Sequence, residues 1–216
     1  MPFDLHGRTL IIAPHPDDEV LGCGGLIAKL VADGNPPYIV ILTGGGASHS
    51  NCCGLESESI VSERRKLTKD ALSILNLPLE NLFELDFKDG HISASDIEEI
   101  REFNKIINDI KPANILVPHK GEGWSDHLAA REIGLSFKEV NLYEYCVWMW
   151  YYHQKELDWH NGYILQLSEN QEGKKRNAIK TYIEPQAPCG NPWSGVLPEV
   201  FIKACSWDKE LYFKLR

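Results

Sequence analysis

Continuous runs of apolar residues near the N-terminus predict strands that are buried on both faces. Residues 9–13 and 38–43 are almost wholly apolar, without alternation, which is typical of inner strands of a parallel sheet. Between them, residues 21–32 carry apolar positions at helical spacing and end at Asp33-Gly34, a sequence typical of a helix C-terminus. These three segments predict a βαβ unit.

The same alternation of strand-like and helix-like segments continues along the chain. Ser95 and Glu98 match the capping box that begins many helices, and the aromatic run 143–152 is expected to be a core strand. The other segments predict helices over 57–75, 95–110, 170–183 and from residue 126, and strands over 82–85 and 113–117. The pattern predicts one α/β domain over residues 1–216, a three-layer sandwich around a mostly parallel sheet.

The composition narrows the class of protein. The 216 residues include 22 Lys and Arg against 31 Asp and Glu, a net charge of −9, whereas nucleic-acid binding needs a basic surface. No stretch approaches the roughly 20 apolar residues of a membrane helix, and the N-terminus lacks a secretory signal pattern. We therefore expect a cytoplasmic protein that binds no nucleic acid and has no transmembrane segment.

The cysteines show no regular spacing. None of the six forms a Cys-x-x-Cys pair, so we expect reduced thiols that are mostly small buried side chains. His49, Cys52 and Cys53 form a candidate soft-metal site, but irregular ligand spacing favours an incidental grouping in a loop. The cysteines are at positions 23, 52, 53, 146, 189 and 205.

Two polar segments directly follow predicted strands. His15 and the carboxylates at 17–19 follow the first strand, and residues 124–127 follow the strand at 113–117. Ligands of parallel α/β sheets bind beyond the carboxyl ends of the strands. If these two strands are neighbours, His15, Asp18 and His127 converge on one point.

Two imidazoles and one carboxylate with an open position form the ligand set of a catalytic zinc ion. Asp17 is then a carboxylate beside the metal that can take a proton from water, and Glu19 and Asp126 would orient the ligands. The alternative is that the acidic residues only cap the following helix, for which one Asp would suffice. The segment therefore predicts a hydrolase.

Two motifs resemble a known family. Residues 14–25, PHPDDEVLGCGG, closely resemble the first signature of the LmbE-like, PIG-L-type zinc-dependent N-deacetylases, and residues 126–130, DHLAA, resemble the second. The resemblance spans residues 8–186 in the order of the elements. It implies a Rossmann-like fold, Zn²⁺ or another divalent metal such as Fe²⁺, and hydrolysis of an acetamido group on a small-molecule or lipid-linked N-acetylglucosamine-type substrate.

The resemblance also implies roles for individual residues. Asp17 is implied as the general base, and the implied zinc ligands are His15, Asp18 and His127. Arg65 and Asp89 match looser positions that contact the sugar. The alternatives are a solvated helix face for Arg65 and a plain Asp-Gly turn for Asp89.

The second motif departs from the family at its first position. The family commonly reads His-x-Asp-His there, with the first histidine assisting the oxyanion, whereas this chain has Trp124. An indole cannot carry positive charge, so we expect another donor and favour His119. Trp124 is then expected to stack on a sugar face, and Glu122 stands near the place of a family tyrosine.

Two other functions are compatible with parts of the sequence. A dinucleotide-binding oxidoreductase is disfavoured, because residues 22–25 lack the G-x-G-x-x-G spacing. A catalytically weak, metal-dependent sugar-binding module remains the alternative, with Trp124 marking lost activity. The basic residues of 174–180 form a candidate phosphate-binding strip, and the sequence is compatible with a homo-oligomer.

Overall fold

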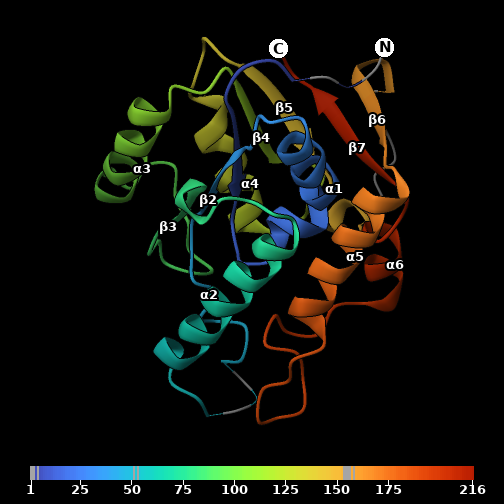
Figure 1. Cartoon of the computed structure of the whole chain (residues 1–216). Helices are drawn as coiled ribbons and strands as arrows, with labels where there is room; N and C mark the ends of the chain where they lie inside the picture. The colour runs from blue at the N-terminus through green and yellow to red at the C-terminus, as the bar shows by residue number, and fades with distance from the viewer. Residues whose placement is uncertain (1–2, 4, 51, 53, 153–156, 158) are drawn as a thin grey trace.

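The computed structural model describes residues 3, 5–50, 52, 54–152, 157 and 159–216. The described residues form one seven-stranded sheet with the order β3-β2-β1-β4-β5-β7-β6 (Figure 1). Strands β1 to β5 are parallel, and β7 runs antiparallel to both β5 and β6. The predicted mostly parallel sheet is confirmed. The strands are β1 (Thr9–Ala13), β2 (Tyr38–Ile41), β3 (Leu82–Glu84), β4 (Asn114–Pro118), β5 (Asn141–Tyr145), β6 (Gly162–Gln166) and β7 (Lys209–Lys214).

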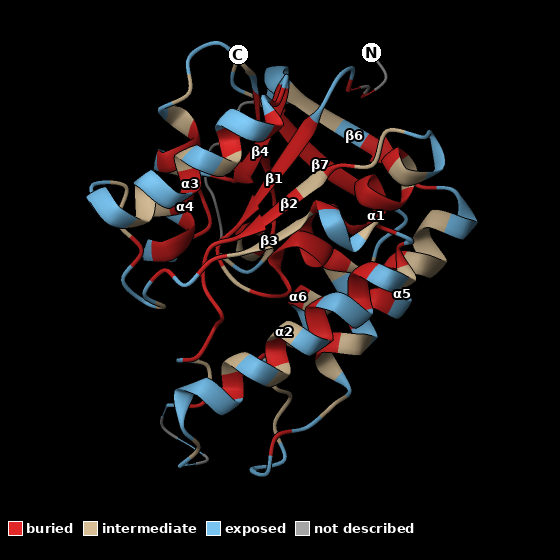
Figure 2. Cartoon of the chain, turned by 60° about the vertical axis from the view of Figure 1, so that its left-hand side comes forward, coloured by how far each residue is buried: buried red, intermediate tan, exposed pale blue. Residues whose placement is uncertain are grey.

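Helices cover both faces of the sheet and so make three layers. Ile11 and Ala13 of β1 belong to a core with α1, α2, α5 and α6, whereas Leu10 and Ile12 face a second core with α3 and α4. Figure 2 shows the buried sheet between helices whose outer sides are exposed. The helices are α1 (Asp18–Ala32), α2 (Ser57–Ile74), α3 (Ile97–Ile110), α4 (Ser125–Leu135), α5 (Glu169–Ile183) and α6 (Glu199–Cys205).

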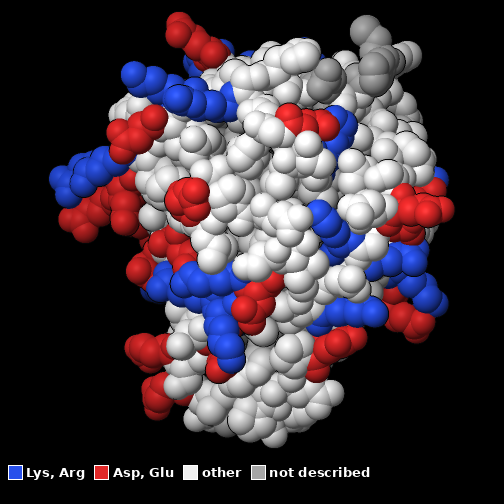
Figure 3. Space-filling model, in the orientation of Figure 1, with Lys and Arg blue, Asp and Glu red and all other residues white. Residues whose placement is uncertain are grey.

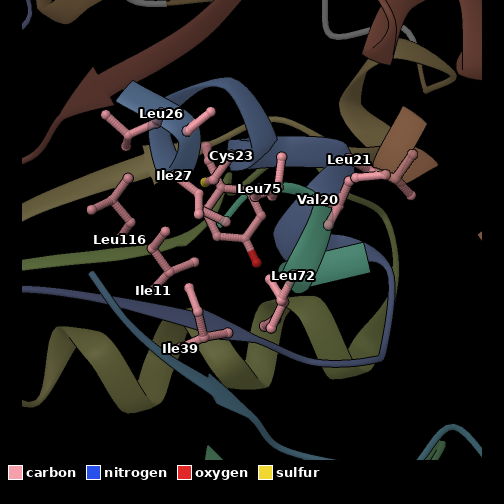
Figure 4. Close-up of a cluster of buried hydrophobic side chains, with 14 of the residues drawn as sticks. Ile11, Val20, Leu21, Cys23, Leu26, Ile27, Ile39, Leu72, Leu75 and Leu116 are labelled. Carbon is pink, nitrogen blue, oxygen red and sulfur yellow. The ribbon is translucent and has the colours of Figure 1, made fainter. Parts of the chain in front are cut away.

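Helix α1 forms the centre of the larger core. Leu26 and Ile27 belong to the same buried cluster as Ile11, Ile39 and Leu116 of the three central strands (Figure 4). Each fully buried aliphatic side chain contributes about 1.5–3 kcal/mol relative to exposure. The first strands and α1 therefore form a rigid base for the loops that follow them.

The start of the third predicted helix differs from expectation. Helix α3 begins at Ile97, and the Asp96 side chain caps it by accepting hydrogen bonds from the amides of Glu98 and Glu99 at 3.0 and 3.1 Å. The predicted capping box of Ser95 and Glu98 is therefore wrong. A carboxylate one residue later takes the cap position, which Asp fills as well as Ser.

The aromatic run 143–152 is not one strand. Strand β5 ends at Tyr145, and Trp148–Trp150 is a short 3-10 helix. The amides of Val147, Trp148 and Met149 donate to the Glu122 carboxylate rather than to a neighbouring strand. The buried carboxylate of Glu122, from a loop distant in the sequence, therefore binds the amides of a turn where the composition predicts a strand.

Strand β7, which the apolar pattern did not predict, contains a buried charge. Glu210 accepts hydrogen bonds from the Lys175 ammonium and the Gly25 amide, both at 2.7 Å. Lys175 lies on α5, so this buried ion pair joins α5, α1 and β7. It leaves Lys175 turned into the core rather than out to a phosphate.

The order of the strands determines where the candidate site residues lie. The chain runs from β1 to β2 and β3 on one side, and β4 then pairs with the other side of β1. The carboxyl ends of β1 and β4 therefore meet at the switch point where α/β sheets bind ligands. None of the helices in the described part of the chain is long and apolar enough to cross a bilayer.

Charged side chains are mixed over the surface. On the face drawn in Figure 3, Lys and Arg alternate with Asp and Glu rather than gathering into a field of one sign. Among the described residues, Lys29 pairs with Asp33 and Arg176 with Glu172, both four residues apart. Such exposed pairs contribute about 0–1 kcal/mol each.

Candidate active site

A cavity of about 340 Å³ opens at the switch point between β1 and β4. Its lining includes residues from the loops after β1, β2, β3 and β4 and from the C-terminal segment. The structure brings most of the predicted residues into it: His15, Asp17, Asp18, Asp89, Trp124, Asp126 and His127.

Asp18 lies at the centre of the predicted ligand set. Its Oδ2 is 3.2 Å from His15 Nδ1 and 3.3 Å from His127 Nε2. Ligands on a tetrahedral zinc ion with metal–ligand distances near 2.0–2.2 Å lie about 3.4 Å apart. The donor types and spacings of His15, Asp18 and His127 therefore fit a divalent cation.

The outer nitrogen of each imidazole meets a further carboxylate. His15 Nε2 is 3.1 Å from Asp126 Oδ2, and His127 Nδ1 is 3.2 Å from Glu122 Oε2. Carboxylates in this position orient metal-bound histidines and select their tautomer. The sequence predicts this role for Asp126 but not for Glu122, which lies in the loop directly before α4.

Asp89 adds another carboxylate to this group. Its Oδ1 lies 3.2 Å from His15 Nε2, and its Oδ2 accepts a hydrogen bond from the Ala47 amide at 2.7 Å. His15, Asp89 and Asp126 thereby form a second candidate cation group. His15 faces Asp18 with Nδ1 but faces Asp89 and Asp126 with Nε2, so one cation bound to His15 can be held by only one of the two groups.

The electrostatics of the site favour positive charge. Burial opposes charge on both imidazoles, yet Asp18 and Glu122 raise the pKa of His127 to about 9. Burial likewise opposes charge on His15, but hydrogen bonds to Asp126, Asp18 and Asp89 raise its pKa well above the ordinary value. The negative potential that holds these protons would also attract a divalent cation.

Asp17 lies beside the ligand set in an unusual backbone conformation. It precedes the first turn of α1 with φ 114°, a strained value for a non-glycine residue that costs about 1–3 kcal/mol. Burial raises the pKa of Asp17 to about 7, although the positive charge of Arg64 lowers it in part. A carboxyl group with this pKa suits general acid–base catalysis near neutral pH.

Glu19 is hydrogen-bonded to the backbone of Asp17 and lies outside the cavity lining. Its Oε2 accepts a hydrogen bond from the Asp17 amide at 3.0 Å, and its Oε1 accepts one from the Tyr182 hydroxyl at 2.5 Å. Burial raises the pKa of Glu19 to about 8. Glu19 therefore contacts the backbone of Asp17, and its expected role in orienting the metal ligands stays a prediction.

Comparison with known proteins decides the family. Residues 10–138, more than half of the chain, match the family model described as GlcNAc-PI de-N-acetylase, PIG-L. This chain belongs to the PIG-L family.

The PIG-L chain has curated relatives and structural neighbours. The diacetylchitobiose deacetylase of Thermococcus kodakarensis is 31% identical over 140 residues, which are 62% of this chain and 50% of that protein. The zinc-inhibited form of a teicoplanin deacetylase superposes with a TM-score of 0.73 at 17% identity, covering 96% of this chain and 97% of that one. The chain thus spans about half the length of the Thermococcus relative.

The fold of this PIG-L chain does not by itself identify a reaction. The 4-carboxy-2-hydroxymuconate hydratase of Pseudomonas putida superposes with a TM-score of 0.68 at 16% identity, covering 97% of this chain and 96% of that one. Similarity at such low identity shows the fold alone. The reaction must therefore be argued from the site residues.

The arginine that reaches the site is Arg64 rather than Arg65. Arg64 is 4% exposed, and its guanidinium donates to the carbonyls of Pro16 at 2.6 Å and Gly45 at 2.9 Å. Arg65 instead pairs with Asp86 at 2.7 Å outside the cavity. The predicted sugar contact of Arg65 is not supported, because successive helical residues point in directions about 100° apart.

His119 does not reach the cavity either. It is 1% exposed, and its Nδ1 accepts a hydrogen bond from the Gly121 amide at 3.0 Å. Its ring packs on Phe213 with the centroids 4.8 Å apart. The expectation that His119 replaces the family histidine is therefore not supported by its position.

Trp124 lies at the mouth of the cavity. Its side chain is 48% exposed and meets Trp148 edge to face, with the ring centroids 5.6 Å apart. Both indoles line the cavity, whereas the basic residues of 174–180 do not. The mouth is therefore aromatic, and the predicted phosphate strip lies elsewhere.

Proposed function

We propose that this protein is a zinc-dependent N-deacetylase that hydrolyses the acetamido group of an N-acetylated amino sugar conjugate. The observation that carries the proposal is the Asp18-centred group, with an imidazole on each side and Asp17 adjacent. The Thermococcus relative, named a diacetylchitobiose deacetylase, supports the same reaction.

His15, Asp18 and His127 would hold the cation. When bound, it would polarise the acetamide carbonyl and lower the pKa of a coordinated water. Two histidines and one carboxylate also suit Fe²⁺, so the proposal includes either metal. Asp126 and Glu122 hold the two imidazoles in the orientation that presents Nδ1 of His15 and Nε2 of His127.

Asp17 would move the protons of the reaction. As a carboxylate it accepts a proton from the water that attacks the carbonyl carbon. As a carboxylic acid it returns that proton to the departing nitrogen when the C–N bond breaks, which yields acetate and a free amine. Its position in the cavity lining beside Asp18 supports both steps.

Aromatic side chains would position the sugar. Trp124 and Trp148 line the cavity, and large aromatic faces suit the apolar face of a sugar ring. Asp89 offers a carboxylate that would accept hydrogen bonds from sugar hydroxyls. The expected substrate class is therefore a small-molecule or lipid-linked GlcNAc-type conjugate.

Acetate release tests the proposal. Zinc-saturated protein would be incubated with free, nucleotide-linked and lipid-linked N-acetylated sugars, and acetate and free amine would be measured. We expect release from at least one class, and a loss of about 10²–10⁴-fold in kcat for Asp17→Asn. Metal content should stay unchanged in this variant.

Asp86→Asn is the matched control, because Asp86 is an exposed carboxylate whose pairing with Arg65 lies outside the cavity. Sugar binding without acetate release by the metal-loaded protein would support the catalytically weak binding module instead. Undiminished turnover by Asp17→Asn would contradict the role of Asp17.

A further inference from the structure

We propose that His49, Cys52 and Cys189 bind a second zinc ion, separate from the Asp18-centred group. His49 and Cys52 lie in the loop after β2, and Cys189 lies in the loop after α5. Cys52 and Cys189 are 137 positions apart in the sequence, yet their sulfur atoms lie 3.6 Å apart. His49 Nδ1 lies 3.1 Å from Cys52 Sγ and 3.6 Å from Cys189 Sγ.

These spacings fit tetrahedral zinc. With Zn–S near 2.3 Å and Zn–N near 2.0–2.1 Å, ligands on one ion lie about 3.8 Å apart for two sulfurs and about 3.6 Å apart for sulfur and nitrogen. The three observed separations, 3.6, 3.1 and 3.6 Å, lie within about 0.5 Å of these values. Three ligands leave one position of the tetrahedron for a further donor.

The histidine is also oriented for ligation. His49 is 2% exposed, and its Nε2 lies 3.0 Å from the carbonyl oxygen of Pro192 and 3.2 Å from that of Trp193. A carbonyl only accepts hydrogen bonds, so Nε2 carries the proton. In the neutral ring the lone pair is then on Nδ1, which faces the two sulfurs, and the carbonyls supply the outer contacts typical of zinc-bound histidine.

The sequence alone favoured an incidental grouping of His49, Cys52 and Cys53. Cys53 lies outside the described residues and has no part in the proposal. Cys189 changes the interpretation, because two thiols and an imidazole from distant segments form the soft donor set that zinc prefers. The oxygen and nitrogen donors around Asp18 are harder, so the two groups differ in ligand chemistry.

The proposed ion would join two segments of the cavity wall. Ala47 and Ser48 on one loop, and Ser194 and Leu197 beyond the other, line the candidate active site. The Ser48 hydroxyl also donates to the carbonyl of Trp193 at 3.2 Å. Zinc at His49 would therefore hold the loop after β2 against the loop after α5 and fix the shape of the mouth.

Cobalt substitution tests this site directly. Co²⁺ bound by thiolates gives an intense sulfur-to-metal charge-transfer absorption in the near ultraviolet, which imidazole and carboxylate ligands do not give. We expect this band in the Co²⁺-loaded protein and its loss in the Cys52→Ser/Cys189→Ser double variant. Zinc content should fall by one equivalent per chain in the same variant, measured by elemental analysis.

Cys205→Ala is the matched control, because Cys205 is buried in the large core away from these loops. It should retain both the band and the zinc. The wild-type spectrum decides the proposal even if the double variant does not fold.

Absence of a thiolate band in the wild-type protein would overturn the proposal, as would an unchanged band in the double variant. A Cys52–Cys189 disulfide in protein purified under reducing conditions would also overturn it. Because the readout is a sulfur-to-metal transition, it is independent of whether the protein releases acetate.

Discussion

Arg64 and Arg65 are adjacent in the sequence but have different environments. Arg64 is buried and donates to the carbonyls of Pro16, after β1, and Gly45, after β2, so it joins these two loops. A Cβ at Gly45 would lie 2.0 Å from Arg64 Nη1, and Gly45 has φ +66°. Glycine is therefore required there for the guanidinium to approach the backbone.

We predict that Arg64→Met lowers the free energy of unfolding by about 3 kcal/mol, because two buried carbonyls lose a charged donor. Arg65→Met should cost less than about 1 kcal/mol, as expected for an ion pair whose carboxylate, Asp86, is exposed. Urea denaturation monitored by circular dichroism measures both. Equal losses in the two variants would show that Arg64 has no special structural role.

At the scale of elements, Glu122 connects α4, which carries the proposed ligand His127, to the irregular turn after β5. It is fully buried, and its carboxylate accepts hydrogen bonds from the amides of 147–149 while contacting His127 Nδ1. The same side chain thus ends β5, shapes the turn at 146–150 and orients a proposed ligand on α4.

We predict that Glu122→Gln weakens zinc binding at the Asp18-centred group about 10- to 100-fold, because an amide carries no charge to support His127. Competition with a chromophoric chelator, in a background of Cys52→Ser/Cys189→Ser, measures this affinity without the second proposed site. Glu80→Gln, on an exposed 3-10 turn, is the control. Unchanged affinity in Glu122→Gln would contradict the supporting role of Glu122.

Most elements followed from local pattern. Strand β1 is predictable from its continuous apolar run and has the predicted bounds. The buried part of α1 is predictable because its apolar residues recur at helical spacing. The aromatic run could not be resolved locally, because Glu122, more than twenty residues earlier, decides where β5 ends. The apolar pattern does not predict strand β7, because the charged Glu210 interrupts the pattern. Only the tertiary structure shows that Glu210 is buried in an ion pair with Lys175.

At the scale of the whole molecule, His119 links stability to pH. Burial lowers the pKa of His119 to about 4, with Lys120 and Arg131 contributing positive charge nearby. In the unfolded chain the pKa of histidine is about 6.5. Between these values the unfolded chain binds a proton that the folded protein does not, so His119 destabilises the fold as pH falls from about 6.5 to 4.

We predict that His119→Gln reduces the acid-induced loss of stability between about pH 6.5 and 4 by up to about 1.4 kcal/mol per pH unit. Above about pH 7 this contribution is absent, so any difference there reflects packing alone. Urea denaturation at a series of pH values measures the slope, with His6→Gln at an exposed position as the control. Parallel pH profiles for wild type and His119→Gln would contradict the shifted pKa.

The sequence by itself determined the mostly parallel α/β architecture and predicted the ligand group, because both depend on local periods and on motifs at strand ends. His15, Asp17 and Asp18 lie within one turn-forming segment, and the rule for strand ends predicted their approach to His127. Tertiary structure alone decided the rest: which arginine reaches the cavity, that Glu122 supports His127, and that Cys189 joins His49 and Cys52. These contacts join segments far apart in the sequence, and their geometry depends on how the helices pack and how the loops turn.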